Sequence, residues 1–297
     1  MFRGLSAFPL TPITASGFDE KGFRRILQRI VAAEADSIGV LGSTGSYAYL
    51  TREQRKHVAT LAVEHANNIP VMVCVGAMAT EQVLHLIDDA QAAGASALLL
   101  PALSYQRLRE DEVFALFETV TRHSALPVCV YDNPGTTHFT FTDALYTRIA
   151  ELTGVGSIKI PGLPEELERA AARVAQIRET LPAKVTLGIS GDAFAGIGLN
   201  AGCEAWYSVC GGLFPHVAKE ITEASARGDR QQVTQLTERL DPLWQLFRKH
   251  GGSIRVIAAA AGVLGLTSGD CLPRPLLPLD AEATAEIATV INVLGLE

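Results

Sequence analysis

Short apolar segments alternate with amphipathic helical segments along most of this 297-residue chain. Apolar residues on both faces of a short segment are typical of parallel strands that are covered by helices on both sides. Eight strands at a spacing of roughly 25–35 residues predict a (β/α)₈ barrel. The alternative is a doubly wound open sheet, but no GxGxxG motif follows the first segment and no P-loop motif occurs. The eight expected strands are 4–10, 37–42, 71–76, 96–101, 128–132, 156–161, 185–190 and 204–209.

Two helical segments carry clear start signals. Asp19 precedes the first one, and an aspartate there accepts hydrogen bonds from backbone N–H groups that the first turn leaves free. Thr51 and Gln54 have the spacing of a capping box before the second. Asp192, which follows the seventh strand, is expected to cap a helix in the same way.

The last seventy residues continue beyond the eight-strand pattern. The eighth strand is expected to end near residue 209 and its helix near residue 227, so the barrel would occupy residues 1–227. We expect residues 228–297 to form a C-terminal helical appendage that packs on the barrel as part of one structural unit. Its helical segments are 229–250, 253–266 and 280–295, with the proline-rich connector "CLPRPLLPL" between the last two.

Charge and hydropathy exclude several classes of protein. A net charge of −7 and a pI near 5.6 argue against a nucleic-acid partner, which requires basic patches. No run of about 18 apolar residues is present, so no membrane span is expected. The N-terminal residues lack the apolar core and cleavage site of a signal peptide. We therefore expect a cytoplasmic protein.

The cysteine and histidine residues give no metal-site pattern. The five cysteines form no CxxC pair and are expected to be reduced and buried. The seven histidines show neither HxH nor HExxH spacing, so we expect no metal ion.

Lys159 interrupts the apolar run "GSIKIP" and constrains function more than any other residue. Side chains alternate along a strand, so Ile158 and Ile160 share one face. Ser157 and Lys159 share the other. The isoleucines suit the helix layer, which places Lys159 inside the barrel near the carboxyl end of its strand, where barrel enzymes hold their active sites. The alternative is a surface lysine with its ammonium group in water.

An interior lysine is suited to attack carbonyl groups. Burial disfavours the ammonium form and lowers the pKa of the side chain. A downward shift of about three pH units would raise the population of free amine roughly a thousandfold. The free amine forms a Schiff base with a ketone, and the iminium converts the neighbouring carbon into an enamine. Lys159 is therefore the candidate nucleophile.

Other strand ends supply polar groups that could assist Lys159. The segment "GSTGS" (42–46) follows the second strand, and its glycines let backbone N–H groups turn toward a carboxylate. Its alternative role is a plain turn. Tyr131, at the end of the fifth strand, could pass a proton to a substrate, or could simply fill the barrel interior.

Taken in order, the segments "GSTGS", "YDNPGTT", "SIKIPG" and "SGD" resemble the dihydrodipicolinate synthase and N-acetylneuraminate lyase family of pyruvate-dependent class I aldolases. The resemblance covers the whole chain. It implies a (β/α)₈ barrel with no metal and no organic cofactor. It also implies a small 2-oxo acid such as pyruvate as substrate, an aldehyde as second partner, and a homo-oligomer, usually a tetramer built as a dimer of dimers, otherwise a dimer.

The resemblance assigns roles to four residues at the pyruvate end of the site. Lys159 matches the family's Schiff-base lysine, and Tyr131 matches the tyrosine that moves protons. Ser43 matches the hydroxyl that relays protons to this tyrosine. Ser43 and Thr44 together match the pair that holds the pyruvate carboxylate.

The remaining matches concern the rest of the pocket. Tyr207 matches a position whose main-chain carbonyl faces pyruvate, and Tyr105 the tyrosine that reaches into the neighbouring subunit's site. Dihydrodipicolinate synthases carry an arginine that grips the carboxylate of aspartate semialdehyde, and Thr136 stands at this position here. A hydroxyl cannot supply that bidentate contact. Ser46 also replaces an acidic residue, and Arg107 is the candidate to compensate for the missing arginine.

The sequence therefore predicts a Schiff-base lyase or aldolase that acts on pyruvate or a related 2-oxo acid through a lysine enamine. One alternative is a true 4-hydroxy-tetrahydrodipicolinate synthase, which joins pyruvate to aspartate semialdehyde. The alternative from another class is a non-catalytic barrel that binds a 2-oxo acid as a sensor or scaffold.

Overall fold

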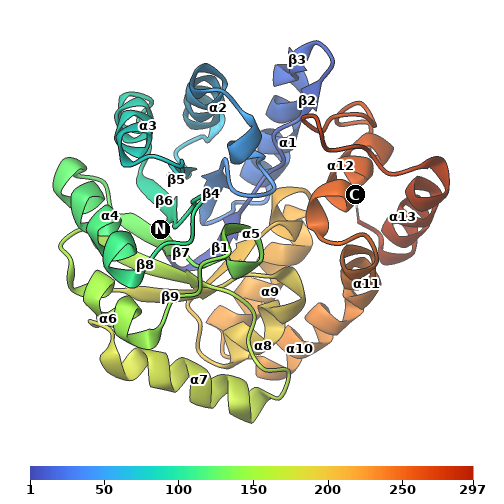
Figure 1. Ribbon diagram of the computed structural model, residues 1–297. Helices are drawn as coiled ribbons and strands as arrows, with labels where there is room; N and C mark the ends of the chain where they lie inside the picture. The colour runs from blue at the N-terminus through green and yellow to red at the C-terminus, as the bar shows by residue number, and fades with distance from the viewer. Residues whose placement is uncertain (297) are drawn as a thin grey trace.

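The computed structural model describes residues 1–296 and contains a closed barrel of parallel strands surrounded by helices (Figure 1). The predicted (β/α)₈ barrel is confirmed. Around the barrel the strand order is β1-β10-β9-β8-β7-β6-β5-β4. The strands are β1 (Gly4–Ala7), β4 (Ser37–Val40), β5 (Val71–Cys74), β6 (Ala97–Pro101), β7 (Val128–Tyr131), β8 (Val155–Ile160), β9 (Thr186–Ile189) and β10 (Ala205–Ser208).

Each barrel strand lies within its predicted segment, except that β8 begins one residue earlier, at Val155. The first strand is shorter than expected and ends at Ala7. Pro9 follows, and it has no N–H group to donate to a sheet. A small hairpin, β2 (Ile13–Thr14) and β3 (Gly17–Phe18), comes before the first helix and was not predicted.

Helices cover the outer face of the barrel, and the expected start signals are present. Asp19 accepts a hydrogen bond from the backbone N–H of Gly22 at 2.9 Å. Thr51 and Gln54 form the reciprocal capping box, with bonds of 2.9 and 3.2 Å. The helices are α1 (Glu20–Ala32), α2 (Arg52–His65), α3 (Thr80–Ala92), α4 (Glu110–His123), α6 (Asp143–Glu151), α7 (Leu167–Thr180), α8 (Ala195–Asn200) and α9 (Pro215–Ala226).

Short helical turns follow several strands at the carboxyl end of the barrel. They are η1 (Tyr47–Tyr49), α5 (Pro134–Thr137), η2 (Asp192–Phe194) and η3 (Cys210–Gly212). These turns lie in the loops that carry most of the candidate site residues.

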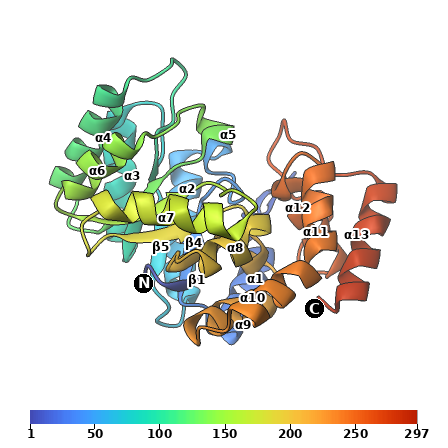
Figure 2. The ribbon, with the colours of Figure 1, turned by 90° about the horizontal axis from the view of Figure 1, so that it is seen from below.

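The C-terminal part of the chain forms α10 (Arg230–Arg239), α11 (Asp241–Lys249), α12 (Ser253–Val263) and α13 (Ala281–Leu294). The predicted segment 229–250 is two helices rather than one, because Pro242 near the start of α11 cannot donate a backbone hydrogen bond to the preceding turn. The helix α10 packs against α8 and α9, whereas α11, α12 and α13 pack on one another at one side of the barrel (Figures 1 and 2). The expected division of the chain at residue 227 stays a prediction.

The core consists of the strand side chains and the inner faces of the surrounding helices. All five cysteines are buried and free, as predicted. Across residues 1–296, none of the helices combines the length and apolar character that crossing a bilayer requires.

Candidate active site

Lys159 lies inside the barrel near the carboxyl end of β8 and is only 4% exposed. Ile158 and Ile160 are buried, as the alternation of the strand requires. Three aromatic rings surround the amine: the Nζ atom is 4.5 Å from the ring centroid of Phe8, 4.7 Å from that of Tyr131 and 5.5 Å from that of Tyr207.

The sheet register brings Lys159 and Tyr131 together. They are paired residues on the adjacent strands β8 and β7, so both side chains point to the same face of the sheet. On the other side, Lys159 pairs with Gly188 of β9. A Cβ atom at position 188 would lie 2.3 Å from a ring carbon of Tyr207, so a side chain there would displace the Tyr207 ring.

Burial lowers the pKa of Lys159 to about 8, while the nearby Cys129 and Asp192 act weakly in the opposite direction. At pH 7 about one molecule in ten would then carry the neutral amine, against less than one in a thousand for an ordinary lysine. No carboxylate within the described part of the chain forms an ion pair with Lys159. The site therefore supplies a usable population of free amine near neutral pH.

Ser43, Tyr131 and Asn133 form a hydrogen-bonded cluster. The hydroxyls of Ser43 and Tyr131 are 3.1 Å apart. The side-chain amide of Asn133 donates to the Tyr131 hydroxyl at 2.9 Å and to the Ser43 hydroxyl at 3.2 Å. Burial raises the pKa of Tyr131 to about 12, although its hydrogen bonds to Ser43 and Asn133 oppose this rise. The phenol therefore keeps its proton near neutral pH and can donate it.

Asn133 was missed by the sequence reasoning, although a signal was present. It lies two residues after Tyr131, and this spacing places two side chains on the same face of an extended segment. Asp132 between them points the other way and accepts a hydrogen bond from Tyr146 of α6. Burial raises the pKa of Asp132 to about 6. The alternation in "YDN" thus directs two side chains to the cavity and one to the helix layer.

The loop after β4 lines the cavity with Ser43, Thr44 and Ser46. Thr44 and Ser46 are buried, and Ser46 has a left-handed backbone conformation with φ near 59°. The Ser46 hydroxyl is enclosed, and no residue in the described range 1–296 bonds to it. The loop therefore offers hydroxyl groups to a ligand on a backbone that the fold already holds in place.

Asp192 does not cap its own helix, so the expected role is wrong. Its carboxylate accepts hydrogen bonds from the Trp206 indole at 3.0 Å, the Ser208 hydroxyl at 3.1 Å and the backbone N–H groups of Val209 and Cys210 at 3.2 and 2.7 Å. These donors lie in β10 and the turn after it. Asp192 therefore ties the end of β9 to the end of β10.

A cavity of about 670 Å³ opens above Lys159. Its inner half is formed by strand ends and the loop after β4, and its outer half by the C-terminal helices. The inner half includes Ser43, Thr44, Tyr131, Asn133, Lys159 and Tyr207. The outer half includes Trp244, Phe247, Arg248, Gly251, Gly252, Ser253, Ile254, Arg255 and Leu276.

The cavity collects six of the seven site residues that the sequence suggested, since Thr136 lines it as well. Tyr105 does not line it and is 89% exposed, so its expected role in a neighbouring subunit stays a prediction. Arg107 is also exposed and lies outside the cavity lining, so Arg107 is not placed to replace the missing arginine within this chain's own pocket. Sequence reasoning did not find the outer half, because helix periodicity says nothing about where α12 packs.

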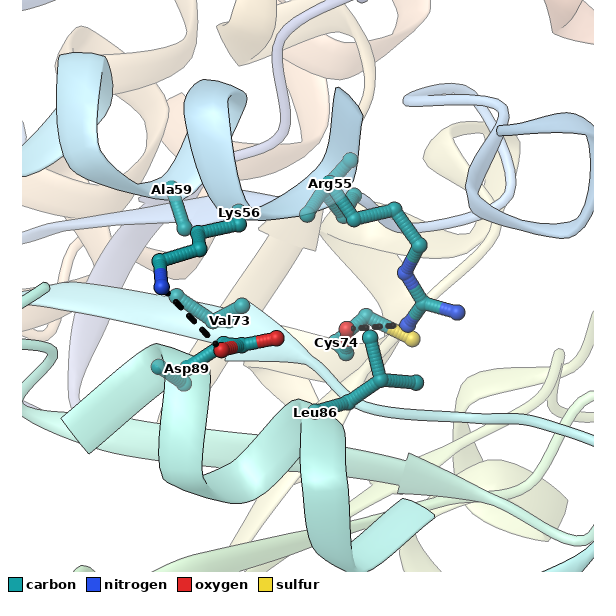
Figure 3. A pocket seen from close by; sticks show the side chains of 9 residues that line it. Arg55, Lys56, Ala59, Val73, Cys74, Leu86 and Asp89 are labelled. Carbon is teal, nitrogen blue, oxygen red and sulfur yellow. Dashed lines mark hydrogen bonds and ion pairs between the residues drawn. The ribbon is translucent and has the colours of Figure 1, made fainter. Parts of the chain in front are cut away.

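A second, much smaller cavity is lined mainly by residues of α2, β5 and α3. It has a volume of about 10 Å³, which is room for about one water molecule. Figure 3 shows Arg55 reaching from α2 to the end of β5, beside the ion pair of Lys56 and Asp89. Arg55 donates to the carbonyl oxygens of Cys74 and Gly76 at 2.7 and 2.8 Å. Its guanidinium also lies 5.5 Å from the ring centroid of Tyr47, which lines the large cavity.

Comparisons with known proteins support a single family. The profile of the dihydrodipicolinate synthetase family matches residues 1–294. The 4-hydroxy-tetrahydrodipicolinate synthase of Parvibaculum lavamentivorans is 27% identical, over 100% of this chain and 99% of its own.

Solved structures agree with this match. The crystal structure of dihydrodipicolinate synthase from Agrobacterium tumefaciens is similar with a TM-score of 0.93 and 40% identity, over 99% of this chain and 98% of that one. A putative dihydrodipicolinate synthetase from Pseudomonas aeruginosa is similar with a TM-score of 0.90 and 26% identity, over 99% of this chain and 100% of that one.

Proposed function

This chain belongs to the dihydrodipicolinate synthetase family, whose members are class I aldolases and lyases that form a lysine Schiff base, and on this premise we propose that Lys159 is its Schiff-base lysine. One observation carries the proposal. Lys159 is a buried amine with a lowered pKa, and it lies beside a protonated phenol at the bottom of a cavity. A structural lysine in a barrel core has no need of such a cavity.

The proposed chemistry begins at the ketone of pyruvate. The neutral Nζ atom attacks the ketone carbon, and a C–N bond forms as the carbonyl oxygen takes up a proton. That oxygen leaves as water, which gives the iminium. Loss of a proton from the methyl group gives the enamine, whose carbon adds to an aldehyde; the same steps in reverse cleave the C–C bond.

Tyr131 and Ser43 are the groups placed to move these protons. The Tyr131 ring is packed against Lys159, and its hydroxyl is within hydrogen-bond distance of Ser43. The raised pKa of Tyr131 keeps the phenol protonated at neutral pH, so a proton is available to the departing oxygen. Asn133 would hold both hydroxyls in place and act as a positioning residue.

The loop after β4 would bind the carboxylate of pyruvate. Ser43 and Thr44 supply hydroxyls and backbone N–H groups, and Tyr207 closes the other side of the cavity beside Gly188. A carboxylate held here would direct the ketone toward Lys159, which lies in the same inner half.

Two second substrates remain in competition. The names of the relatives favour aspartate semialdehyde, which would make this chain a 4-hydroxy-tetrahydrodipicolinate synthase. Thr136 offers only a hydroxyl where a carboxylate of that aldehyde would need a cation. We therefore favour an aldolase or lyase with another aldehyde or 2-oxo acid. A coupled assay with pyruvate and aspartate semialdehyde decides between them.

We also propose that the protein is a homo-oligomer, either a dimer or a tetramer built as a pair of dimers. The large exposed ring of Tyr105 supports an interface at this loop. Sedimentation equilibrium of the wild type and of Tyr105→Ser measures the assembly, and a monomeric wild type would remove this part of the proposal.

Borohydride trapping tests the Schiff base. Incubation with pyruvate and borohydride should add the mass of the reduced adduct to the peptide that contains Lys159. Lys159→Arg should give no adduct, whereas the exposed Lys184→Arg, a matched control, should be labelled like the wild type. A protein that binds pyruvate tightly without any adduct would instead be the sensor or scaffold, and an adduct on another lysine would contradict the assignment.

A further inference from the structure

The outer half of the cavity contains a cation that the proposed chemistry does not use. We propose that Arg255 binds a second carboxylate, at the far end of the substrate from the 2-oxo group, so that the enzyme acts on a chain with an anionic group at each end. The inference rests on the proposed function only for the identity of the near end, which Lys159 engages.

Arg255 is a part-buried arginine without a partner. It lies in the first turn of α12 and lines the same cavity as Lys159. Within residues 1–296, its guanidinium forms no ion pair or hydrogen bond with another residue. A guanidinium stays charged at every physiological pH and offers five N–H donors in a planar fork that matches a carboxylate. Those donors are therefore available to a ligand.

Apart from Lys159, the other charged residues of the lining already have partners. Arg248 is exposed and pairs with Asp241 at 3.1 Å. Asp192 is an acidic member of the lining, but its oxygens accept four hydrogen bonds from β10 and the turn after it. No acid of the lining thus neutralises Arg255, and the lining carries more positive than negative charge.

The backbone N–H groups beside Arg255 also favour the binding of an anion. Gly252 precedes the 11-residue helix α12, and no side chain caps its first N–H groups. Gly251, Gly252, Ser253 and Ile254 all line the cavity. A helix N-terminus carries partial positive charge, which adds to that of the guanidinium. The two sources of positive potential therefore coincide at one end of the cavity.

Apolar side chains also line the cavity that holds the two cationic regions. Phe194, Trp244, Phe247 and Leu276 line the cavity, and the rings of Trp244 and Phe247 pack with their centroids 5.6 Å apart. These side chains favour the uncharged middle of a ligand. A cavity of about 670 Å³ is also far larger than the three carbons of pyruvate require. The arrangement suits a chain that is apolar or weakly polar in the middle and carboxylated at both ends.

Matched pairs of 2-oxo acids test this without assuming the natural substrate. Calorimetry would compare 2-oxoglutarate with 2-oxopentanoate, and 2-oxoadipate with 2-oxohexanoate; within each pair the distal carboxylate is replaced by a methyl group. The wild type should bind at least one dicarboxylate better than its partner. Arg255→Gln should weaken that dicarboxylate about tenfold or more, since charge-assisted bidentate bonds are lost, and should leave the methyl-ended acids within about twofold.

Two further variants make the result specific. Arg230→Gln removes the same charge from an exposed arginine of α10 that does not line the cavity, and it should behave as the wild type. Arg255→Lys keeps the charge but not the fork, so its affinity for the dicarboxylate should lie between those of the wild type and Arg255→Gln. Thermal melting of each variant checks that the fold is intact.

The possible outcomes separate the inference from the proposed function. The inference is wrong if the wild type prefers none of the dicarboxylates, or if Arg255→Gln weakens both members of a pair equally or weakens neither. The proposed function fails instead if pyruvate and borohydride leave Lys159 unlabelled. The calorimetric comparison does not require a covalent bond, so it decides the role of Arg255 in either case.

Discussion

The inner and outer halves of the large cavity are built in different ways. The inner half is set by the register of paired strands, and its polar groups already bond to one another: Ser43, Tyr131 and Asn133 form one cluster. The outer half is set by the packing of α11 and α12, and its principal cation, Arg255, has no partner in the described chain. The difference agrees with the two proposals, in which the barrel supplies the reacting groups and the appended helices select what else the substrate carries.

The largest expected effect is that of replacing Lys159, which lies in the inner half of the cavity. Lys159→Met removes the proposed nucleophile, so activity should fall by more than about a thousandfold. The same substitution should stabilise the fold at pH 7. The folded pKa of about 8 lies below the unfolded value of about 10.4, so the wild-type folded state carries a buried charge at a cost of up to about 3 kcal/mol.

The sign of that effect can be followed with pH. Below pH 8 the lysine is charged in both states and the penalty is complete, so Lys159→Met should be more stable than the wild type. The wild type gains stability relative to the variant between about pH 8 and 10.4, where the unfolded chain binds more protons. Urea unfolding at pH 7 and pH 10 measures this. Equal stability of the two proteins at both values would show that Lys159 is not a buried charge.

Tyr131→Phe should lower the rate of C–C bond chemistry by about a hundredfold to a thousandfold, because the ring remains packed against Lys159 but no proton is donated. Steady-state kinetics with pyruvate and the best available aldehyde would measure the loss. The affinity of this variant for a distal carboxylate should be unchanged. The substitution would then affect the inner half of the cavity without affecting the outer half. A parallel loss of that affinity would show that the halves are coupled.

The pH dependence should also differ between the halves. The rate of borohydride trapping by pyruvate should rise about tenfold per pH unit up to pH 8 and then level off, because the neutral amine of Lys159 is the reacting form. Binding of the distal carboxylate should stay constant over this range, since a guanidinium does not titrate there. A trapping rate that keeps rising about tenfold per unit to pH 10 would contradict the lowered pKa of Lys159.

Asn133→Leu should have the smallest effect of the three substitutions, a decrease of about tenfold in activity. It removes two hydrogen bonds to hydroxyls but leaves both hydroxyls in place. The bond from Asn133 also helps to lower the pKa of Tyr131, so its loss should move the alkaline limb of the pH–rate profile upward. If Asn133 had a purely structural role, the substitution would change the melting temperature and leave the pH–rate profile unchanged.

The residues that sequence reasoning located are those whose positions follow from periodicity. Strand alternation alone places Lys159 inside the barrel, and the rule that parallel strands end at one rim brings Tyr131 and the loop of Ser43 to it. The register that pairs Lys159 with Tyr131 is consistent with that prediction. Local signals such as the capping box of Thr51 were equally readable.

The residues that it missed depend on contacts between distant segments. The partners of Asp192 lie on β10, so a local capping rule assigned it the wrong role. The amide of Asn133 donates a hydrogen bond to Ser43, which is 90 positions away in the sequence. Arg255 lies in an ordinary helix, and only the placement of the C-terminal helices beside the barrel brings it to the cavity. Neither the composition of the chain nor the spacing of its apolar residues contains information about these contacts.

The pairing of Lys159 with Tyr131 has a consequence for how such a protein can diversify. A single-residue insertion or deletion in β8 would turn the amine toward the helix layer and put an isoleucine in its place, since neighbouring positions on a strand face opposite ways. The glycines ahead of α12 face open space, so changes of length there would leave the barrel intact. New specificities are therefore accessible through the appended helices, while the reacting centre tolerates no shift in frame.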